Sequence, residues 1–265
     1  MPNKIDKYGL CLEEYSSNKN NADVYFKRAI GKYPEMEVSK ALAKIVNKSI
    51  KNNEKVLDVG CASGHFYKSL KKRIKKNFFY TGCDPYEIFL KLARKAWKNE
   101  KNTKFIKANI YKLPFKKNSH DITYCSNVLL HLPDLKKPLK ELIKVTKRKL
   151  ILRTVVYDVS YKIQLVYNNK WWKYTKTKPI DEFDSKGNPR SFSYFNIHSK
   201  DYLVALIKKL APKSKIKFIK DNKFSKKQIM NSKKNEKRPL ATTIIKGEQF
   251  SGCLMQPHFF VVIDL

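Results

Sequence analysis

The sequence predicts an α/β fold in which a doubly wound, mostly parallel sheet is covered by helices on both faces. Apolar strand-like segments alternate with amphipathic helix-like segments between residues 35 and 156. This repeated order requires parallel strands joined by right-handed crossovers. Two further features indicate a nucleotide-like ligand at one edge of the sheet. They are a glycine turn after the first strand and an acid at the end of the second.

The glycine turn lies in the segment Val56-Leu57-Asp58-Val59-Gly60-Cys61-Ala62-Ser63-Gly64. Its apolar start is typical of a strand that is buried on both faces of a parallel sheet. Gly60 and Gly64 lack a Cβ atom, so the backbone can turn sharply and lie close to a ligand. The helix predicted over residues 65–74 then presents unpaired N–H groups and its positive dipole end at the same place.

Two other phosphate-binding motifs do not match this turn. The dinucleotide pattern Gly-x-Gly-x-x-Gly would need glycines where Ala62 and His65 stand. A Walker loop would end in Gly-Lys-Ser or Gly-Lys-Thr, whereas this turn ends in Gly64-His65-Phe66. The simplest structural alternative is a buried strand followed by an ordinary turn.

The second predicted strand, Phe78 to Asp84, ends in a carboxylate 20 residues after Gly64. A carboxylate at the end of the neighbouring strand can accept hydrogen bonds from both ribose hydroxyls of an adenosine. The alternative is that Asp84 caps the next helix, predicted from Tyr86 to Trp97, and the two roles are compatible.

Later segments complete the predicted sheet. A third strand starts at Thr103 and a fourth at His120, and the fifth spans Lys149 to Val156. His131 follows the fourth strand, and we expect it to begin the next helix, whose amphipathic part covers residues 134–146. A helix from about residue 201 with Ser199 as its cap, a sixth strand over 215–220 and a final strand over 257–264 follow.

Together these segments resemble class I S-adenosylmethionine-dependent methyltransferases, in particular the small-molecule, ubiquinone-biosynthesis type. Asp58, Gly60 and Gly64 match the family motif Asp-x-Gly-x-Gly-x-Gly, with Ala62 in place of the middle glycine. Residues 111–115 resemble the family's aromatic-x-Leu-Pro-Phe loop, and residues 120–132 resemble its fourth strand and exit. The resemblance covers roughly residues 35–156. It implies a Rossmann-like sheet of seven strands, the last one reversed between strands five and six.

The resemblance also implies S-adenosyl-L-methionine as cofactor and S-adenosyl-L-homocysteine as product. Asp84 would bind the ribose, and Asn109 stands where the family often has an aspartate that meets the adenine amino group. The amide oxygen of Asn109 can still accept from that group. The implied cofactor-binding residues are Asp58, Gly60, Cys61, Gly64, Asp84, Asn109, Ile110, Ser126 and Asn127.

Residues 157–199 interrupt the alternation, and we expect a substrate lid inserted after the fifth strand. The alternative is that its aromatic residues pack a small core of their own. The remaining expected units are an N-terminal lid or cap over residues 1–34, where a helix carries Tyr25 and Arg28, and a methyltransferase domain over 35–265 with a basic loop at about 221–256. Candidate acceptor-binding residues in the insertion are Trp171, Trp172, Tyr194 and His198.

The formal net charge of +34 results from 57 Lys and Arg against 23 Asp and Glu. Because lysines occur throughout the chain, a solvated basic surface is the simpler interpretation. The alternative is attraction to nucleic acid, an acidic membrane surface or a phosphorylated substrate. The lysine-rich stretch over residues 221–238 is the most basic part, and we leave open whether it is a loop or a phosphate-binding arm.

The remaining composition predicts a cytoplasmic protein with reduced thiols. No run of 18 or more apolar residues occurs, and the first residues lack the apolar block of a secretory signal. The cysteines lack the spacing of a metal site or a disulfide framework, so no metal is expected. They are Cys11, Cys61, Cys83, Cys125 and Cys253.

We therefore expect methyl transfer to a small-molecule acceptor, with oxygen of a sugar, a lipid precursor or an aromatic metabolite favoured. His131 is the candidate general base, and its alternative role is to cap a helix or shape the pocket. RNA or protein methylation is the main alternative, although residues 126–129 do not match the signature of many base-amino methyltransferases. A third hypothesis is a catalytically silent subunit that binds cofactor or RNA.

Overall fold

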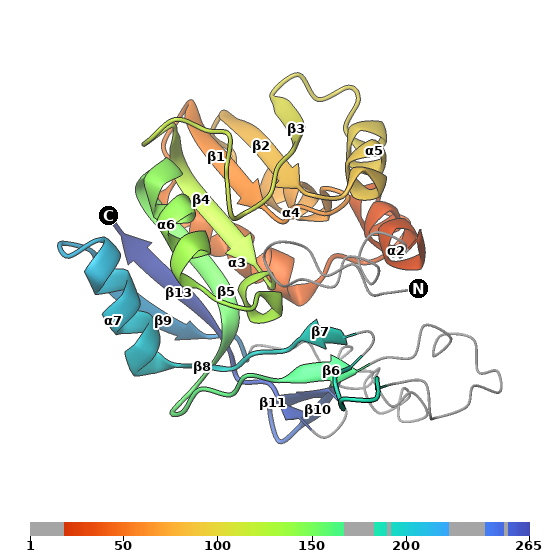
Figure 1. Cartoon of the computed structure of the whole chain (residues 1–265). Helices are drawn as coiled ribbons and strands as arrows, with labels where there is room; N and C mark the ends of the chain where they lie inside the picture. Colours follow the sequence, from red (N-terminus) through yellow and green to blue (C-terminus); the bar gives the residue numbers. More distant parts are fainter. Residues whose placement is uncertain (1–18, 167–182, 190–191, 223–241, 252–253) are drawn as a thin grey trace.

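The computed structural model describes residues 19–166, 183–189, 192–222, 242–251 and 254–265 (Figure 1). Its central sheet has the strand order β3-β2-β1-β4-β5-β13-β9, and the short β8 (His198–Ser199) pairs with the end of β5. The seven strands are β1 (Glu54–Val59), β2 (Phe78–Asp84), β3 (Thr103–Lys107), β4 (His120–Ser126), β5 (Thr146–Tyr157), β9 (Lys215–Lys220) and β13 (His258–Asp264).

The first five strands of this sheet are parallel, and β13 runs antiparallel to both of its neighbours. The doubly wound α/β fold and the reversed final strand are therefore confirmed. Because parallel strands end at one edge, the turns after β1, β2 and β4 lie next to one another. That edge is where the sequence places the ligand.

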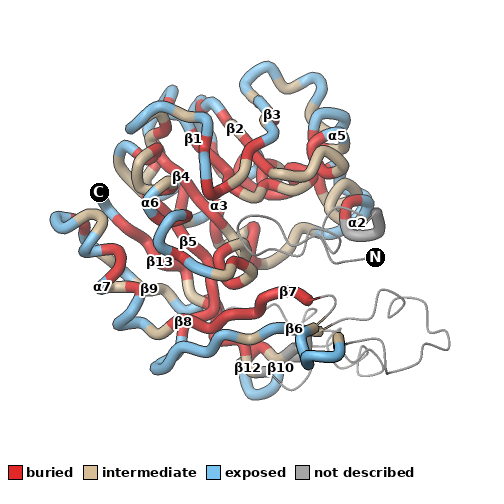
Figure 2. The backbone as a smooth tube through the Cα atoms, in the orientation of Figure 1, coloured by how far each residue is buried: buried red, intermediate tan, exposed pale blue. Residues whose placement is uncertain are grey.

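Helices cover both faces of the sheet. The layer of α3 (Glu37–Ser49), α4 (His65–Arg73) and α5 (Glu87–Ala96) packs on one face, while α6 (Lys136–Val145) and α7 (Lys200–Leu210) pack on the other. Figure 2 shows the buried residues concentrated along the central strands. Strand β1 alternates between the layers, since Val56 faces α3 and α4 whereas Leu57 and Val59 face α6 and α7.

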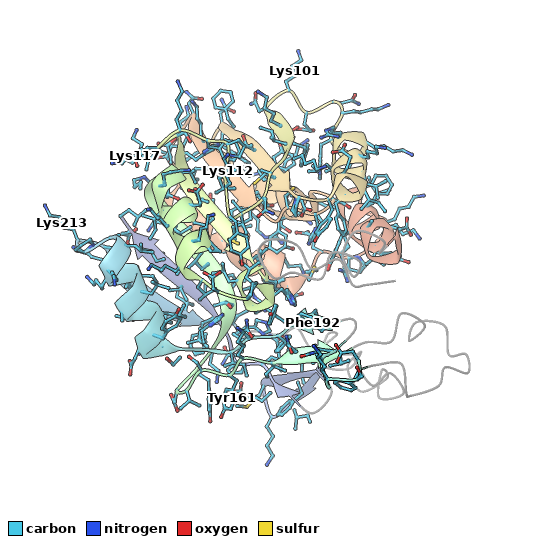
Figure 3. The ribbon with its side chains drawn as sticks, viewed as in Figure 1. Lys101, Lys112, Lys117, Tyr161, Phe192 and Lys213 are labelled. Carbon is cyan, nitrogen blue, oxygen red and sulfur yellow. The ribbon has the colours of Figure 1, made fainter. Side chains whose placement is uncertain are left out.

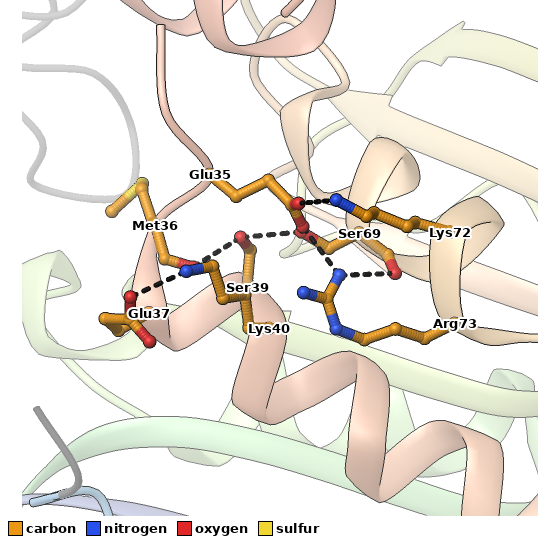
Figure 4. Close-up of polar contacts among 8 residues, drawn as sticks. All are labelled: Glu35, Met36, Glu37, Ser39, Lys40, Ser69, Lys72 and Arg73. Carbon is orange, nitrogen blue, oxygen red and sulfur yellow. Dashed lines mark hydrogen bonds and ion pairs between the residues drawn. The ribbon is translucent and has the colours of Figure 1, made fainter. Parts of the chain in front are cut away.

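A buried polar cluster joins α3 to α4 (Figure 4). Ser69 Oγ and Arg73 Nη1 each donate to Glu35 Oε2 at 2.6 Å, and the hydroxyls of Ser39 and Ser69 are 2.9 Å apart. Glu35, which is partly buried, is therefore satisfied by one neutral donor and by two cations, since Lys72 Nζ also lies 3.5 Å from its Oε1. The cluster fixes the helix that begins at the glycine turn.

Several predicted elements have different bounds. His131 does not begin a long helix. It ends the 3₁₀ helix η1 (Leu129–His131), and α6 starts only at Lys136 because Pro133 intervenes. Strand β5 starts at Thr146, directly after α6, rather than at Lys149. Ser199 caps α7 as predicted, its hydroxyl accepting from the Tyr202 N–H at 3.2 Å.

Two small sheets lie beyond the carboxyl end of β5 (Figure 1). One pairs β6 (Gln164–Val166) with β7 (Phe192–Tyr194), within the predicted insertion. The other pairs β10 (Thr242–Ile245), β11 (Glu248–Ser251) and β12 (Leu254–Met255), where a basic loop was expected. That part of the expected loop is therefore a sheet. Most of the lysine-rich stretch, residues 223–238, lies outside the described residues, as do Trp171, Trp172, Cys11 and Cys253.

Within the ranges given above, no helix is long and apolar enough to cross a membrane. Cys61, Cys83 and Cys125 are buried and free, which confirms the expectation of buried thiols for these three.

Candidate functional site

The glycine turn has the backbone geometry that its sequence predicts. Gly60 and Gly64 have φ angles of 82° and 72°, in the left-handed region that favours glycine. A Cβ atom on Gly60 would lie 2.3 Å from Val128 Cγ2, so a side chain there would collide with the exit of β4. The N–H groups of Gly60 and Cys61 both donate to Cys83 O, at 2.8 and 3.0 Å. The turn is thus fixed between β2 and β4.

Asp84 lies at the end of β2, beside this turn, and is 6% exposed. Its Oδ2 accepts from the Ala62 N–H and its Oδ1 from the Tyr86 N–H, each at 3.0 Å. Burial raises the pKa of Asp84 to about 6, against the effect of these two hydrogen bonds. The carboxylate therefore caps the next helix and also braces the turn. Each oxygen keeps a second lone pair for a ligand hydroxyl.

Asp58 points into the layer of α3 and α4 and is 2% exposed. Its Oδ2 accepts from both tyrosine hydroxyls of the neighbouring strands, Tyr80 at 2.7 Å and Tyr124 at 2.9 Å. Burial raises the pKa of Asp58 to about 7, while the two hydrogen bonds act in the opposite direction. In the folded chain this motif residue links β1 to β2 and β4.

The remaining candidate cofactor residues lie at the same edge. Ser126 ends β4, and its Oγ is buried without a hydrogen-bond partner in the part of the chain that is described. Asn127 follows with a φ of 59°. After β3, Asn109 uses its Oδ1 to accept from the Tyr111 N–H at 3.0 Å, and Ile110 is buried. An unpaired buried hydroxyl beside a glycine turn suits a site that a polar ligand completes.

Comparison with known proteins agrees with this geometry. Residues 57–152 match a family of methyltransferase domains. An uncharacterised methyltransferase of Schizosaccharomyces pombe is 35% identical over 108 residues, 38% of each chain. The ubiquinone/menaquinone biosynthesis C-methyltransferase of Wigglesworthia glossinidia brevipalpis is 34% identical over 98 residues, 36% of this chain and 39% of that protein. A solved S-adenosylmethionine-dependent methyltransferase of Methanosarcina mazei matches with a TM-score of 0.53 at 15% identity, covering 83% and 96% of the two chains.

This chain carries a class I methyltransferase domain. It spans about two fifths of the length of the two curated relatives named here. At 15% identity the solved structure supports the fold alone. The family match runs from the second half of β1 to residue 152 in β5, so it contains all the candidate cofactor-binding residues.

Helix α2 (Lys19–Ala29) packs on the glycine turn of the methyltransferase domain. The Tyr25 ring stacks on His65 with 4.7 Å between ring centroids and 11° between planes. Ser63 Oγ donates to Ala22 O at 3.1 Å. Burial is the main cause that lowers the pKa of His65, to about 3, and its Nδ1 has no partner in the described part of the chain. The helix therefore covers the first turn of α4.

His131, at the end of η1, lies next to β7. Its Nδ1 is 2.8 Å from Tyr194 O, and because a carbonyl only accepts, Nδ1 carries the hydrogen. The lone pair of this tautomer is then on Nε2. Burial lowers the pKa of His131, against the hydrogen bond to Tyr194, so the ring is neutral at neutral pH.

His198, the second histidine of the candidate set, is also buried, and burial lowers its pKa to about 4. Its Nε2 has no hydrogen-bond partner among the described residues. Tyr194 presents its backbone oxygen to His131, and its ring lies 5.6 Å from Lys162 Nζ. Tyr194 therefore lies beside His131. The acceptor-binding roles of Tyr194 and His198 stay predictions.

A buried ion pair, Arg153 with Asp221, was not predicted from the sequence. Arg153 of β5 is 4% exposed and donates from Nε to Asp221 Oδ2 at 2.7 Å. Its Nη1 donates to Asn127 Oδ1. His258 of β13 is buried nearby, and its pKa is lowered first by burial and then by the charge of Arg153. An arginine within an otherwise apolar strand was the only local signal.

Proposed function

We propose that this chain transfers a methyl group from S-adenosylmethionine to an oxygen atom of a small-molecule acceptor. A sugar, a lipid precursor and an aromatic metabolite are the acceptor classes we consider. The observation that carries the proposal is the edge at which the Gly60 turn, the buried carboxylate of Asp84 and the unpaired hydroxyl of Ser126 meet.

The residues at this edge suit the two ends of the cofactor. In this proposal the Asp84 oxygens would accept from the ribose hydroxyls, and the glycine turn would lie against the chain that joins ribose to amino acid. When bound, S-adenosylmethionine supplies an electrophilic methyl carbon on a sulfonium that leaves as a neutral thioether. The protein holds the acceptor oxygen in line, about 3 Å from that carbon, and alignment alone accounts for much of such a rate.

His131 supports an oxygen acceptor because a hydroxyl must lose its proton as the new bond forms. With Nδ1–H held by Tyr194 O, the ring is neutral and Nε2 is its basic nitrogen, the atom that would receive that proton in the proposed step. A ring whose pKa is lowered by burial stays unprotonated at neutral pH and remains competent as a base. The His131→Gln variant should therefore lose methyl transfer while keeping cofactor binding.

The described parts of the insertion support an enclosed site for a small acceptor. Asn196 donates from Nδ2 to Leu132 O and from its backbone N–H to Leu130 O, both at 2.7 Å. Phe195 and Ile197 pack against Leu130 and Val155. The insertion is thus joined to the exit of β4, where the acceptor would approach.

Net charge favours RNA as a second acceptor class. In Figure 3 the labelled lysines Lys101, Lys117 and Lys213 lie at separate points on the outside of the molecule. Lysines also occur throughout the sequence, which agrees better with a solvated basic surface than with one RNA-binding face. RNA is therefore an outcome of the test rather than our first proposal.

The test uses S-adenosylmethionine with a tritiated methyl group, incubated with the protein and extract of its source cells. RNA, protein, lipid and metabolite fractions are counted separately, with the Asp84→Ala variant as the inactive control. Label in the lipid or metabolite fraction supports the proposal, and NMR of the product distinguishes oxygen from carbon methylation. Label that is lost on ribonuclease treatment, or label in protein, contradicts the small-molecule acceptor. No label despite cofactor binding would indicate a catalytically silent subunit.

A further inference from the structure

The two edges of the central sheet differ in charge. We call the edge at which the parallel strands begin the amino edge; β9 also begins there, because β13 is antiparallel to both β5 and β9. The connections that lead into β1, β2, β3, β4 and β9 reach this edge over residues 50–53, 74–77, 97–102, 116–119 and 211–214. They contain one acid, Glu100, and eight lysines. The lysines are Lys51, Lys75, Lys76, Lys98, Lys101, Lys116, Lys117 and Lys213.

The opposite edge, where the glycine turn lies, has no such charge. The connections that leave β1, β2 and β4 span residues 60–64, 85–86 and 127–135, and they contain no lysine or arginine. Lysines therefore occur throughout the sequence, but the fold does not distribute them evenly between the two edges. Because the excess lies opposite the glycine turn, it does not favour RNA as the methyl acceptor.

The eight lysines of the amino edge have no anionic partner. All eight are exposed, and none makes an ion pair with a described residue. Nearby acids are already paired with other cations, as Glu54 is with Arg148 at 2.6 Å and Glu100 is with Lys71. Uncompensated charges of one sign along a surface raise the local concentration of a polyanion.

Backbone hydrogen bonds hold the connections of the amino edge. The Asn53 N–H donates to Asn77 O at 2.7 Å, and the Asn77 N–H donates to Asn52 Oδ1 at 2.9 Å. The Asn118 N–H donates to Lys144 O at 2.9 Å. In Figure 3 the labelled Lys101, Lys117 and Lys213 mark this edge before β3, β4 and β9.

The length of the amino edge suits a chain of phosphates. Neighbouring strands lie about 4.8 Å apart, so a sheet of seven strands extends for about 30 Å. One strand of a nucleic-acid duplex carries a charge about every 3.4 Å, so this length corresponds to about nine phosphates.

A hollow of about 230 Å³ opens in the amino edge between residues 74–77 and 97–102. Its lining includes hydrogen-bond donors from both connections, namely Lys75, Lys76, Asn77, Lys101 and Asn102. Glu100 also lines it, and this carboxylate already accepts from Lys71 and from the Tyr67 hydroxyl. Lysine and asparagine side chains are among the groups that contact phosphate and sugar oxygens of nucleic acids.

We propose that the amino edge binds the phosphodiester backbone of a nucleic acid, without reading its sequence. The five connections contain no arginine, the residue that most often reads a base, whereas lysine binds phosphate as a point charge. An anionic membrane is the other partner that a basic surface attracts. Binding in its interface uses apolar side chains, and none of the exposed large apolar side chains in the described ranges belongs to these connections. The inference does not depend on the proposed function.

The test is the fluorescence anisotropy of a fluorescein-labelled oligouridylate of about 20 nucleotides, with the wild type and two variants that each lose four lysines. The edge variant is Lys75→Gln/Lys101→Gln/Lys116→Gln/Lys117→Gln. Lys76 is kept because its Nζ donates to Ile50 O at 2.6 Å. The control variant is Lys32→Gln/Lys112→Gln/Lys186→Gln/Lys246→Gln, whose lysines are exposed too but lie outside the five connections.

At about 0.1 M salt we expect the edge variant to bind roughly tenfold more weakly than the wild type, and the control variant within about threefold of it. The slope of log K against log salt should fall in magnitude by about 3 in the edge variant, since each phosphate contact to a single strand contributes about 0.7. An oligothymidylate of the same length should bind like the oligouridylate. Binding of only one of the two would contradict recognition through the phosphates.

Equal losses in the edge and control variants would overturn the inference, because binding would then follow net charge alone. It would also be overturned if the wild type bound neither oligonucleotide at low salt, including the case in which vesicles of phosphatidylserine and phosphatidylcholine bind instead. The edge variant should keep the wild-type affinity for S-adenosylhomocysteine, and a loss of it would contradict the separation of the two edges. A wild type that binds oligonucleotide but not S-adenosylhomocysteine would contradict the proposed function and leave this inference standing.

Discussion

The two halves of the ligand edge bury opposite charges and stabilise them differently. At β1 and β2 the buried groups are acids, and burial raises the pKa of Asp58 to about 7 and that of Asp84 to about 6. At β4, β5 and β13 they are basic, and burial lowers the pKa of Arg153 and of His258. Neutral donors satisfy the acids, namely tyrosine hydroxyls and backbone N–H groups, whereas a second charge, Asp221, satisfies Arg153.

The difference shows which half tolerates substitution. An acid bonded by neutral donors can take up a proton if a donor is lost, because its pKa is already raised toward neutrality. Removing one member of a buried ion pair leaves the other without compensation, and this costs more than the loss of one neutral donor. Replacing Arg153 or Asp221 alone should therefore lower the free energy of unfolding more than replacing one donor in the first half. Replacing both together should lower it much less.

The largest effect is expected for Arg153→Met alone. This variant leaves the Asp221 carboxylate buried without its partner and should lose about 3–5 kcal/mol in the free energy of unfolding. The Arg153→Met/Asp221→Leu variant should recover most of that loss. Urea unfolding of both proteins measures the difference. Equal stabilities would show that the unpaired Asp221 carboxylate does not lower the free energy of unfolding.

A pH effect should come next in size and concerns His65 in the first half. Its folded pKa of about 3 lies below the ordinary value of 6.5, so the unfolded chain binds the proton more readily between these values. The stability that this residue contributes is complete above pH 6.5 and is lost as the pH falls toward 3. Between pH 7 and pH 4 the loss should be about 3 kcal/mol.

The His65→Phe variant keeps an aromatic ring on Tyr25 and should flatten the acid limb of a plot of unfolding free energy against pH. Asp58 has the opposite sign, because its folded pKa of about 7 is above the ordinary 3.8, so it favours folding at low pH. Asp58→Asn should therefore steepen the same limb. An unchanged slope in His65→Phe would contradict the buried, neutral histidine.

The smallest expected effect is a difference in stability between alanine variants of two glycines that have nearly the same φ angle. Gly60 has φ 82° and Gly247 has φ 83°, but a Cβ on Gly247 would meet no atom within 4 Å. Gly60→Ala should be less stable than Gly247→Ala by about 1–3 kcal/mol, the usual range for overpacking. Adding Val128→Ala to Gly60→Ala should remove that excess. If the two alanine variants melt alike, the turn is not held against β4.

The first half of the edge was predictable because its signals are local. The strand, the turn and the helix that frame Gly60 lie in one segment, and the acid of β2 follows in the next. The same holds for the cap of α7 by Ser199, which needs only the residues beside it.

The second half depends on residues that are distant in sequence. Arg153 looks like one polar residue in a strand until Asp221 comes into contact from the end of β9, 68 residues later. His131 was expected at a helix start, but Pro133 delays α6 and leaves the histidine in a 3₁₀ turn. Residues 242–251 and 254–255 have strand pairing that their basic surroundings obscured.

The most direct test of the methyltransferase proposal is a calorimetric titration of S-adenosylhomocysteine into the wild type and into Asp84→Ala. The matched control is Asp121→Ala, since Asp121 also accepts a backbone N–H, from Lys55 at 2.9 Å, but lies at the start of β4 and hence at the opposite edge. We predict binding to the wild type and to Asp121→Ala, and at least tenfold weaker binding to Asp84→Ala. Equal affinity of all three proteins would contradict the placement of the ribose on Asp84, and absence of binding to the wild type would contradict the cofactor itself.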